Sequence, residues 1–475
     1  MNKSLSIDSI EVAIFLAFVA GAALWGLAQF GTLYLALLFF SAPVLVIGIR
    51  HPPVIAGICY VGVLLDASAM TQQEIFGLPI TLAKLFVFAG LIAWFCHSCF
   101  WRKPLVKWHP LANAMLLIVI TGALSLMVAH FRPMGVIQLA SITMCITLSI
   151  LVTTILDEKD IKPLLRFMAV SLFLLLMIVY FQGNMGTRDA HRVFMESMEL
   201  EYGDYERISG TLADPNEYCA MLIVMVPLLF CAMMTDEHPL AKWIALGLAM
   251  AFVIGIINTM SRAGMAVGVL CVPPLIWYFR HRISLPILAI GLAFAIALPV
   301  LSKFDTASER WSGLLGNEIG FTGTESLRER AALTQAGIAT LKENWVWGVG
   351  AGNLLYRHGF VTADLDFKVV HNTYLQFAAE QGIPGFLAML VIGWTLLRTL
   401  FQSIRYARTP YNEACAFGMT VGILGWAGMA ATLDLSTQSQ AYFLFGVAMA
   451  IHRSIMQQHE KARENAQPTF QLVGS

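Results

Sequence analysis

Long apolar runs dominate the chain, and most of them are close to 20 residues long. The runs lie at roughly 11–30, 31–49, 54–69, 79–98, 111–129, 135–155, 167–184, 217–234, 241–258, 263–279, 284–301, 373–397, 413–432 and 439–452. A helix needs about 20 apolar residues to cross the bilayer core, where backbone groups must be paired internally. The pattern predicts an all-α, polytopic transmembrane helical bundle. Because the first two runs are poorly separated and the last is short, we expect about 12–14 spans.

Composition agrees with this class. Hydrophobic residues make up 58% of the 475 residues and charged residues 13%, whereas soluble domains have about 45–50% and about 25%. This balance excludes an ordinary soluble protein, and also a disordered chain, which needs the opposite balance. Thirty basic residues are matched by 30 acidic ones, so bulk charge gives no support for nucleic-acid binding.

The distribution of Lys and Arg predicts the orientation. One set of loops holds 17 basic residues and the short loops of the opposite side hold six, while the other seven lie in the long segment 302–372. Long segments contribute little to the positive-inside rule. We therefore expect cytoplasmic N- and C-termini. The expected organisation is N-terminal transmembrane helices 1–184, a first outer loop 185–216, central transmembrane helices 217–301, a large outer loop 302–372, C-terminal transmembrane helices 373–452 and a polar cytoplasmic tail 453–475.

The large outer loop has an ordered pattern of its own. Ser326 to Glu329 form a capping box, and Leu327, Thr334, Ile338 and Leu341 recur at helical spacing. We expect an amphipathic helix over 326–343, lying against the membrane face. The turn Gly348 to Asn353 follows it. These glycines do not form a phosphate-binding loop, since no strand precedes them and no Lys-Ser/Thr follows, so they are expected to break the helix.

Two outer features carry arginines at the mouths of helices. Arg207 precedes Asp214-Pro215-Asn216, a helix-start signal in which Asp214 or Asn216 would act as the cap. Arg262 lies in the very short hairpin Ser261-Arg262-Ala263-Gly264. A charge at that depth faces the bundle interior or a watery cavity, or else snorkels to the interface.

Two further features complete the set. Arg328 and Arg330 lie in the amphipathic segment, either on a solvated face or at a binding site. His371 is the last polar residue before an apolar helix, and is either structural or catalytic, while Asn372 could cap that helix. Guanidinium groups suit phosphate oxygens, and a histidine suits proton abstraction near neutral pH. Together they predict a site for an anionic phosphate substrate at the outer edge of the bilayer, and a lipid-tailed diphosphate would fit there.

The order and separation of these motifs resemble the O-antigen ligase and polysaccharide polymerase superfamily over about 200–385. The matching stretches are Arg207…Gly210…Asp214-Pro215-Asn216, Ser261-Arg262-Ala263-Gly264, Arg328/Arg330…Trp347-Gly348-Val349-Gly350-Ala351-Gly352-Asn353, and His371-Asn372-Thr373-Tyr374-Leu375…Glu380-Gln381-Gly382-Ile383-Pro384-Gly385. The resemblance implies a GT-C-like membrane glycosyltransferase of the bacterial inner membrane, with its active site facing the periplasm. It implies a glycan donor on undecaprenyl diphosphate, and neither a metal nor another cofactor.

The resemblance also implies roles for individual residues. His371 matches the base that takes the proton from the acceptor hydroxyl, and transfer proceeds with inversion. Arg207, Arg262 and one of Arg328 and Arg330 match the arginines that hold the diphosphate. Arg132, in the turn His130-Phe131-Arg132-Pro133, is a further candidate contact by position alone. Asn216, Asn372 and Tyr374 are expected to support the site.

Several functions stay open on the sequence alone, because the motifs report how the donor is handled. A ligase would transfer the glycan to lipid A-core. A polymerase would transfer the growing chain to the next lipid-linked repeat unit, and a third variant would use a protein hydroxyl. A transporter or flippase, from a different class, would instead predict repeat symmetry and charge near the bilayer midplane.

Overall fold

The computed structural model describes residues 47–64, 74–75, 78–79, 82–182, 212, 214–259, 261–281, 321–356 and 370–466. Its helices are α3 (Pro52–Leu64), α4 (Leu82–Trp101), α5 (Pro110–Ser125), α6 (Arg132–Ile155), α7 (Glu158–Gln182), α9 (Pro215–Met234), α10 (Pro239–Asn258), α11 (Arg262–Phe279), α14 (Phe321–Glu343), α16 (Thr373–Tyr406), α17 (Pro410–Ala430) and α18 (Ser439–Ala466). Two strands of two residues each, β1 (Glu74–Ile75) and β2 (Leu78–Pro79), pair antiparallel with Ile75 opposite Leu78.

The prediction of a multi-pass, all-helical bundle is confirmed. Seven of the described helices are long and apolar enough to cross a membrane, and three shorter apolar helices accompany them. The predicted spans 11–30 and 284–301, and all but the last three residues of 31–49, lie outside the described residues. The count of about 12–14 spans therefore stays a prediction. At the C-terminus, α18 continues through the predicted tail as far as Ala466.

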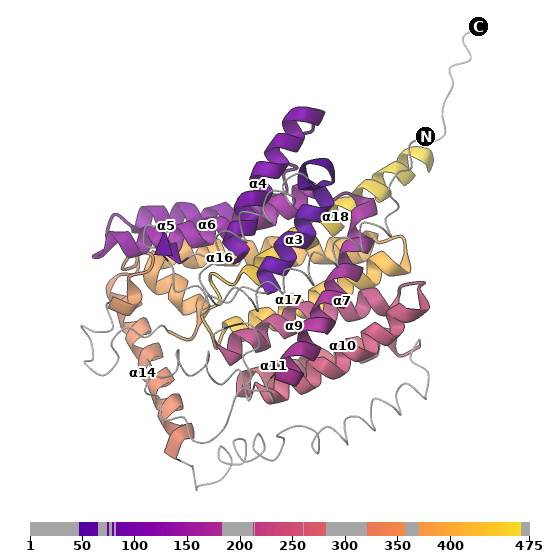
Figure 1. The fold of residues 1–475 in the computed structure, drawn as a ribbon. Helices are drawn as coiled ribbons and strands as arrows, with labels where there is room; N and C mark the ends of the chain where they lie inside the picture. The colour runs from indigo at the N-terminus through magenta and orange to yellow at the C-terminus, as the bar shows by residue number, and fades with distance from the viewer. Residues whose placement is uncertain are drawn as a thin grey trace, which may run out of the picture.

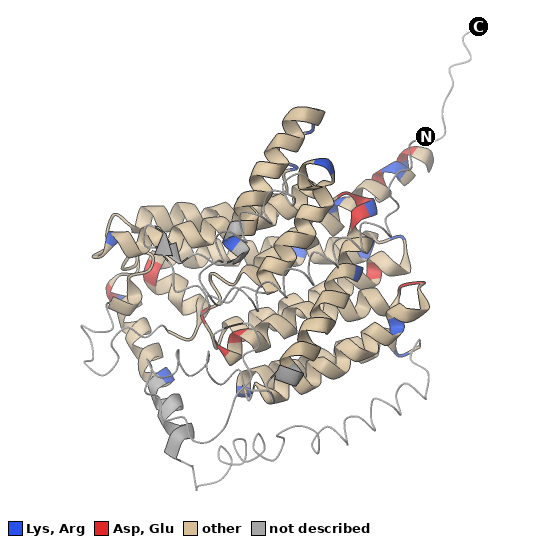
Figure 2. Ribbon diagram, in the orientation of Figure 1, with Lys and Arg blue, Asp and Glu red and all other residues tan. Residues whose placement is uncertain are grey.

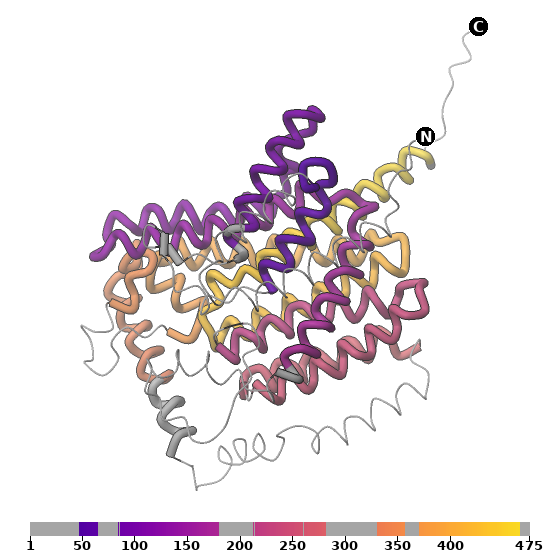
Figure 3. Tube along the Cα trace, viewed as in Figure 1, coloured from indigo at the N-terminus to yellow at the C-terminus, as the bar shows by residue number. Residues whose placement is uncertain are grey.

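Most long helices run side by side in Figure 1, and α14 crosses one end of this bundle (Figures 1 and 3). The centre is α9, whose side chains from Tyr218 to Met225 are all buried and which packs along α17 and α10. Glycines allow the close approach to α17, because a Cβ on Gly422 would lie 2.4 Å from the carbonyl oxygen of Val224. Lys, Arg, Asp and Glu are few along the middle of these helices (Figure 2).

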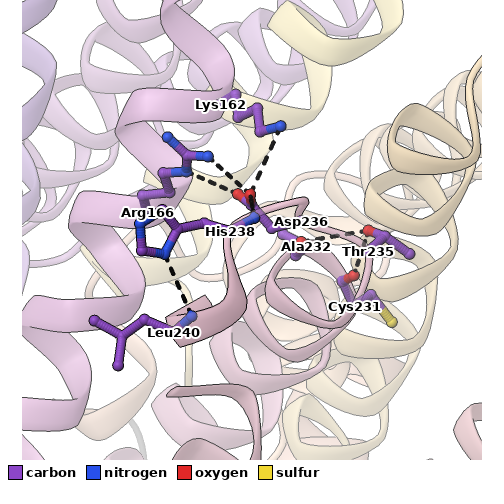
Figure 4. A network of polar contacts seen from close by, with 8 residues as sticks. All are labelled: Lys162, Arg166, Cys231, Ala232, Thr235, Asp236, His238 and Leu240. Carbon is purple, nitrogen blue, oxygen red and sulfur yellow. Dashed lines mark hydrogen bonds and ion pairs between the residues drawn. The ribbon is translucent and has the colours of Figure 1, made fainter. Parts of the chain in front are cut away.

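One end of the bundle, which we call the Asp236 end, is held by an ion pair. The Asp236 side chain is fully buried between α9 and α10 and accepts hydrogen bonds from Arg166 of α7 at 2.7 and 2.8 Å, while Lys162 lies 3.7 Å away (Figure 4). Burial acts to raise the pKa of Asp236, but the bonds from Arg166 and from the His238 backbone outweigh it and lower the pKa to about 2. The pair ties α7 to the α9–α10 connection.

Two histidines join three more helices at the same end. The backbone N–H of Leu111 donates to His109 Nδ1 at 3.1 Å, so the ring proton of neutral His109 sits on Nε2 and faces His452 Nδ1 at 3.0 Å. His452 Nε2 can then donate to Gln402 at 3.2 Å. Burial, with His452 and the charge of Arg453, lowers the pKa of His109 to about 4. The chain of bonds works only with both rings neutral.

The opposite end, which we call the His371 end, contains the starts of α6, α9, α11, α16 and α18. Here α16 is broken at Gly382, whose φ of 69° and ψ of −164° interrupt the helix. The sequence predicted a single span over 373–397, but α16 consists of an outer segment, 373–381, and an inner segment, 383–406. The turn after α14 fills the break, since Ile383 N donates to the carbonyl of Trp345 at 2.8 Å.

Candidate functional site

His371 lies immediately before the first turn of α16 and is half-buried. Asn372 caps this helix, because its side chain accepts a hydrogen bond from the backbone N–H of Leu375 at 3.0 Å. The predicted capping role of Asn372 is therefore confirmed. Tyr374 is also anchored, with its hydroxyl donating to the carbonyl of Ala427 in α17 at 2.8 Å.

The connection between α17 and α18 is clamped onto the residue that follows this cap. Thr373 donates to the carbonyl of Leu433 through both its backbone N–H, at 3.0 Å, and its hydroxyl, at 2.7 Å. The hydroxyl accepts in turn from the N–H of Leu435 at 2.9 Å. Asp434 lies between these two anchors, so an acidic side chain is held near the His371 segment. Burial raises the pKa of Asp434, although hydrogen bonds from Ser436 oppose the shift.

The same connection reaches the start of α9. Gln438 donates to the backbone carbonyl of Glu217 at 3.3 Å and accepts from the indole of Trp426 at 2.7 Å. Asp214 is the cap of α9, accepting from both the backbone and the side chain of Asn216 at 2.7 and 2.8 Å. Of the two predicted caps, Asp214 caps the helix and Asn216 holds the capping carboxylate.

Arg262 lies at the first position of α11, against α9. Ser261 caps α11 by accepting from the N–H of Gly264 at 3.2 Å. Gly264 rests on Cys219, because a Cβ added there would lie 2.1 Å from the Cys219 sulfur. The absence of a side chain at Gly264 therefore brings the start of α11 against the first turn of α9. A continuous series of contacts now connects the segments that carry His371 and Arg262.

Arg132 lies at the start of α6 and is exposed. Asn353 holds this turn by accepting from the backbone N–H of Phe131 at 2.7 Å and donating to its carbonyl at 3.3 Å. Ala351 N donates to the hydroxyl of Ser125 at the end of α5, 3.0 Å away. The glycine turn thus joins the α5–α6 connection to α16.

Arg330 lies in α14, which packs on the outer segment of α16. Gly337 makes the approach close, because a Cβ there would lie 3.1 Å from Leu375 and 3.2 Å from Val370. The helix begins at Phe321, five residues before the predicted start, and ends at Glu343 as predicted. The predicted contact of its apolar stripe with the membrane face stays a prediction. Leu333, Ala336 and Thr340 are buried, whereas Ile338 is 41% exposed.

The structure therefore brings Arg132, Arg262, Arg330 and His371 to one end of the bundle on four different elements. Arg207 lies outside the described residues, and Arg328 lies in the first part of α14, where only the helix itself is described. Asp434 was missed by the sequence reasoning, although the polar run between the last two apolar segments was a signal. In the described part of the chain, no group of three or more His, Cys, Asp or Glu side chains is placed to hold a metal ion.

The described part of the chain is thus a multi-pass helical membrane protein with a histidine and several arginines at one end of its bundle. Residues 245–390 match the family model described as O-antigen ligase, which covers most of α10, all of α11 and α14, and the first half of α16. Residues 245–390 therefore form a domain of the O-antigen ligase family, a family of enzymes of ligase- or polymerase-type glycan transfer at membranes. No protein of curated function matches the sequence.

Proposed function

We propose that the enzyme transfers a glycan from undecaprenyl diphosphate to a hydroxyl of lipid A-core, as an O-antigen ligase does. The observation that carries this proposal is the series of contacts from Thr373 through the α17–α18 connection to the start of α9, and on to α11. This series keeps His371 and Arg262 at one end of the bundle, although they are 109 positions apart in the chain. A base and a diphosphate-binding group must share one end for the transfer to occur.

In the proposed reaction, an imidazole nitrogen of His371 takes the proton of the acceptor hydroxyl. The oxygen attacks the anomeric carbon from the face opposite the diphosphate, so the configuration inverts. The bond from that carbon to the diphosphate oxygen breaks, and undecaprenyl diphosphate leaves with the electron pair. Arg262, together with Arg207 and one of Arg328 and Arg330, binds the diphosphate and stabilises its growing negative charge. Arg132 is a further contact by its place at the same end.

The arginines are proposed to take the role that a divalent metal has in metal-dependent transferases, so no metal or other cofactor is required. Asn216, Asn372 and Tyr374 support the site indirectly, because their bonds fix the starts of α9 and α16. Asp434 is added to this group as an acidic neighbour of the His371 segment.

We also propose that the His371 end faces the periplasm of a bacterium and that the protein lies in its inner membrane. Basic residues gather at the Asp236 end, where Lys107, Lys162, Arg166 and Arg453 each bond to a neighbouring helix or connection. An excess of Lys and Arg marks the cytoplasmic side. The substrates would then be the lipid-linked glycan in the outer leaflet and an acceptor presented from the same side.

Replacing His371 by Ala tests the proposed base. Transfer should be lost while expression and membrane insertion are unchanged, because His371 is at a helix end and not in the packed core. Turnover at the wild-type rate would remove its role as the base.

The acceptor is tested in a deletion strain. Lipid A without long glycan chains, together with accumulated lipid-linked polymer, supports ligase activity. Lipid A capped with single repeat units would instead identify a polymerase.

A further inference from the structure

Glu380 is a buried acidic residue that the transfer reaction does not use. It lies in the outer segment of α16, two residues before the break at Gly382, and its residue surface is 1% exposed. Its position is nine residues beyond His371, or about 13 Å along a helix. Glu380 therefore acts away from the reacting atoms, and its role must concern how the surrounding elements are held.

The backbone around Glu380 is bonded to the glycine turn. Gly350 N donates to the carbonyl of Glu380 at 2.9 Å, and Val349 N donates to the carbonyl of Ala379 at 3.0 Å. These carbonyls lose their helical partners at the break, so the turn replaces the missing hydrogen bonds. The end of α14 is thereby fixed to the outer segment of α16.

The side chain of Glu380 faces a group of buried amides. Oε1 accepts a hydrogen bond from Gln376, one turn earlier in α16, at 2.5 Å. The side chain of Gln138, from α6, and the backbone N–H of Gly352 also lie against the carboxyl group. Glu380 is therefore at the point where α16, α6 and the glycine turn meet.

Three buried side-chain oxygens at this junction lack a hydrogen-bond donor among the described residues. They are Oε2 of Glu380, Oε1 of Gln138 and Oε1 of Gln376. Two acceptors cannot pair with each other unless one of them carries a proton. In the described part of the chain no Lys or Arg forms an ion pair with Glu380. Asp434 is the titratable group that interacts with Glu380, and because it is also acidic, its charge repels that of an ionised Glu380. Burying a carboxylate without a cation costs free energy. A protonated carboxyl group carries no charge, and it can donate a hydrogen bond to an acceptor that has no other donor.

We propose that Glu380 is a positioning residue that stays protonated and donates its O–H to Oε1 of Gln138. This bond joins the outer segment of α16 to α6, about 9 Å along the helix from Arg132. Together with the bonds from the glycine turn, it sets the start of α16 relative to α6 and to the end of α14. The inference rests on the proposed function in one respect, which is that His371 has to be held against the diphosphate-binding arginines.

The first experiment compares Glu380→Gln with Glu380→Ala in purified protein. A glutamine can donate to Gln138 and accept from Gln376, as the protonated acid does, so Glu380→Gln should keep the transfer rate within about threefold. Glu380→Ala should lower the rate by about tenfold or more, because misplacing a catalytic group by about 1 Å can cost 10²-fold. Equal loss in both variants would overturn the proposal, since the carboxyl chemistry itself would then be required.

A second measurement reads the protonation state directly. The infrared spectrum of the wild-type protein at neutral pH should contain the carbonyl band of a protonated carboxyl group, and Glu380→Gln should remove it. If the two spectra do not differ in that band, Glu380 is ionised and the proposal is wrong. This readout does not need activity, so it still decides the question if Glu380→Ala fails to fold.

The outcomes also separate this inference from the proposed function. An active His371→Ala variant would refute the base, yet the infrared band would be unaffected. Hydrogen exchange of the backbone at 345–353 and 373–381 should be faster in Glu380→Ala than in wild type and unchanged in His371→Ala. Unchanged exchange in a folded Glu380→Ala protein would contradict the positioning role.

Discussion

A single methyl group added at Gly382 should separate α14 from α16. Gly382 has φ of 69° and ψ of −164°, a region that is essentially restricted to glycine, so any other residue there costs about 1–3 kcal/mol of backbone strain. A Cβ would also lie 2.4 Å from the carbonyl oxygen of Val346 and 2.8 Å from the backbone nitrogen of Trp347. Neither contact is with a flexible side chain, so the two backbones have to move apart.

The magnitude follows from the bonds that this movement breaks. The N–H groups of Ile383, Val349 and Gly350 each donate across the junction at 2.8–3.0 Å, and each bond is worth about 0.5–1.5 kcal/mol net. Adding the strain gives a loss of about 2.5–7.5 kcal/mol for Gly382→Ala. Gly393 offers a matched control in the same helix, because a Cβ there meets nothing within 4 Å. Gly393→Ala should be neutral or should stabilise the helix by about 0.5–1 kcal/mol.

Thermal unfolding of the two variants in the same detergent is the assay, with glycan transfer measured in parallel. Gly382→Ala should unfold at a clearly lower temperature than wild type and lose most of its transfer activity. Gly393→Ala should unfold at the wild-type temperature or above and stay active. If both variants unfold together, the glycine junction does not hold the two helices together.

Three further predictions concern the site and the Asp236 end. Arg262→Lys keeps the charge but not the planar fork, so transfer should fall by about tenfold or more; a fully active lysine variant would refute bidentate binding. Asp236→Asn removes the ion pair with Arg166 and should lower the unfolding temperature by an amount corresponding to about 1–2 kcal/mol. The loss is limited because the Arg166 side chain is 39% exposed, so solvent partly screens the pair. An unchanged melting curve would mean that the pair does not contribute to stability. For His109, the pKa in the folded protein, about 4, lies below the ordinary value of 6.5. The unfolded chain therefore binds more protons than the folded protein between these two pH values. The free energy of unfolding should fall as the pH drops through that range, by roughly 3 kcal/mol at most. His109→Gln should reduce this acid sensitivity, and a pH profile identical to that of wild type would mean that the sensitivity does not arise from His109.

Much of the bundle could be predicted from the sequence, since membrane helices are marked by long apolar runs and their starts by short polar caps. Asp214 and Asn372 cap α9 and α16 as their positions before apolar runs suggested. The break in α16 could not be predicted in the same way. Apolar residues continue through Ile383 and Pro384, and the conformation of Gly382 depends on the turn after α14 that packs against it.

The tertiary partners of polar residues were also beyond the sequence. Glu380 and Gln381 read as part of a polar motif, yet both are buried, because Gln138 and Thr121 from distant helices approach them. The contact of α14 with Val370 and Leu375 was likewise not predictable, because helical spacing shows which side chains share a face but not which element packs on it.

The central claim is that this enzyme cleaves the bond between a glycan and undecaprenyl diphosphate when an acceptor hydroxyl is present. The direct measurement uses purified protein in lipid, an undecaprenyl-diphosphate-linked glycan and lipid A-core. Released undecaprenyl diphosphate should equal the glycan gained by the acceptor, and neither should form when the acceptor is omitted. Movement of the intact glycolipid across the bilayer, with no cleavage in the presence of any acceptor, would contradict the account.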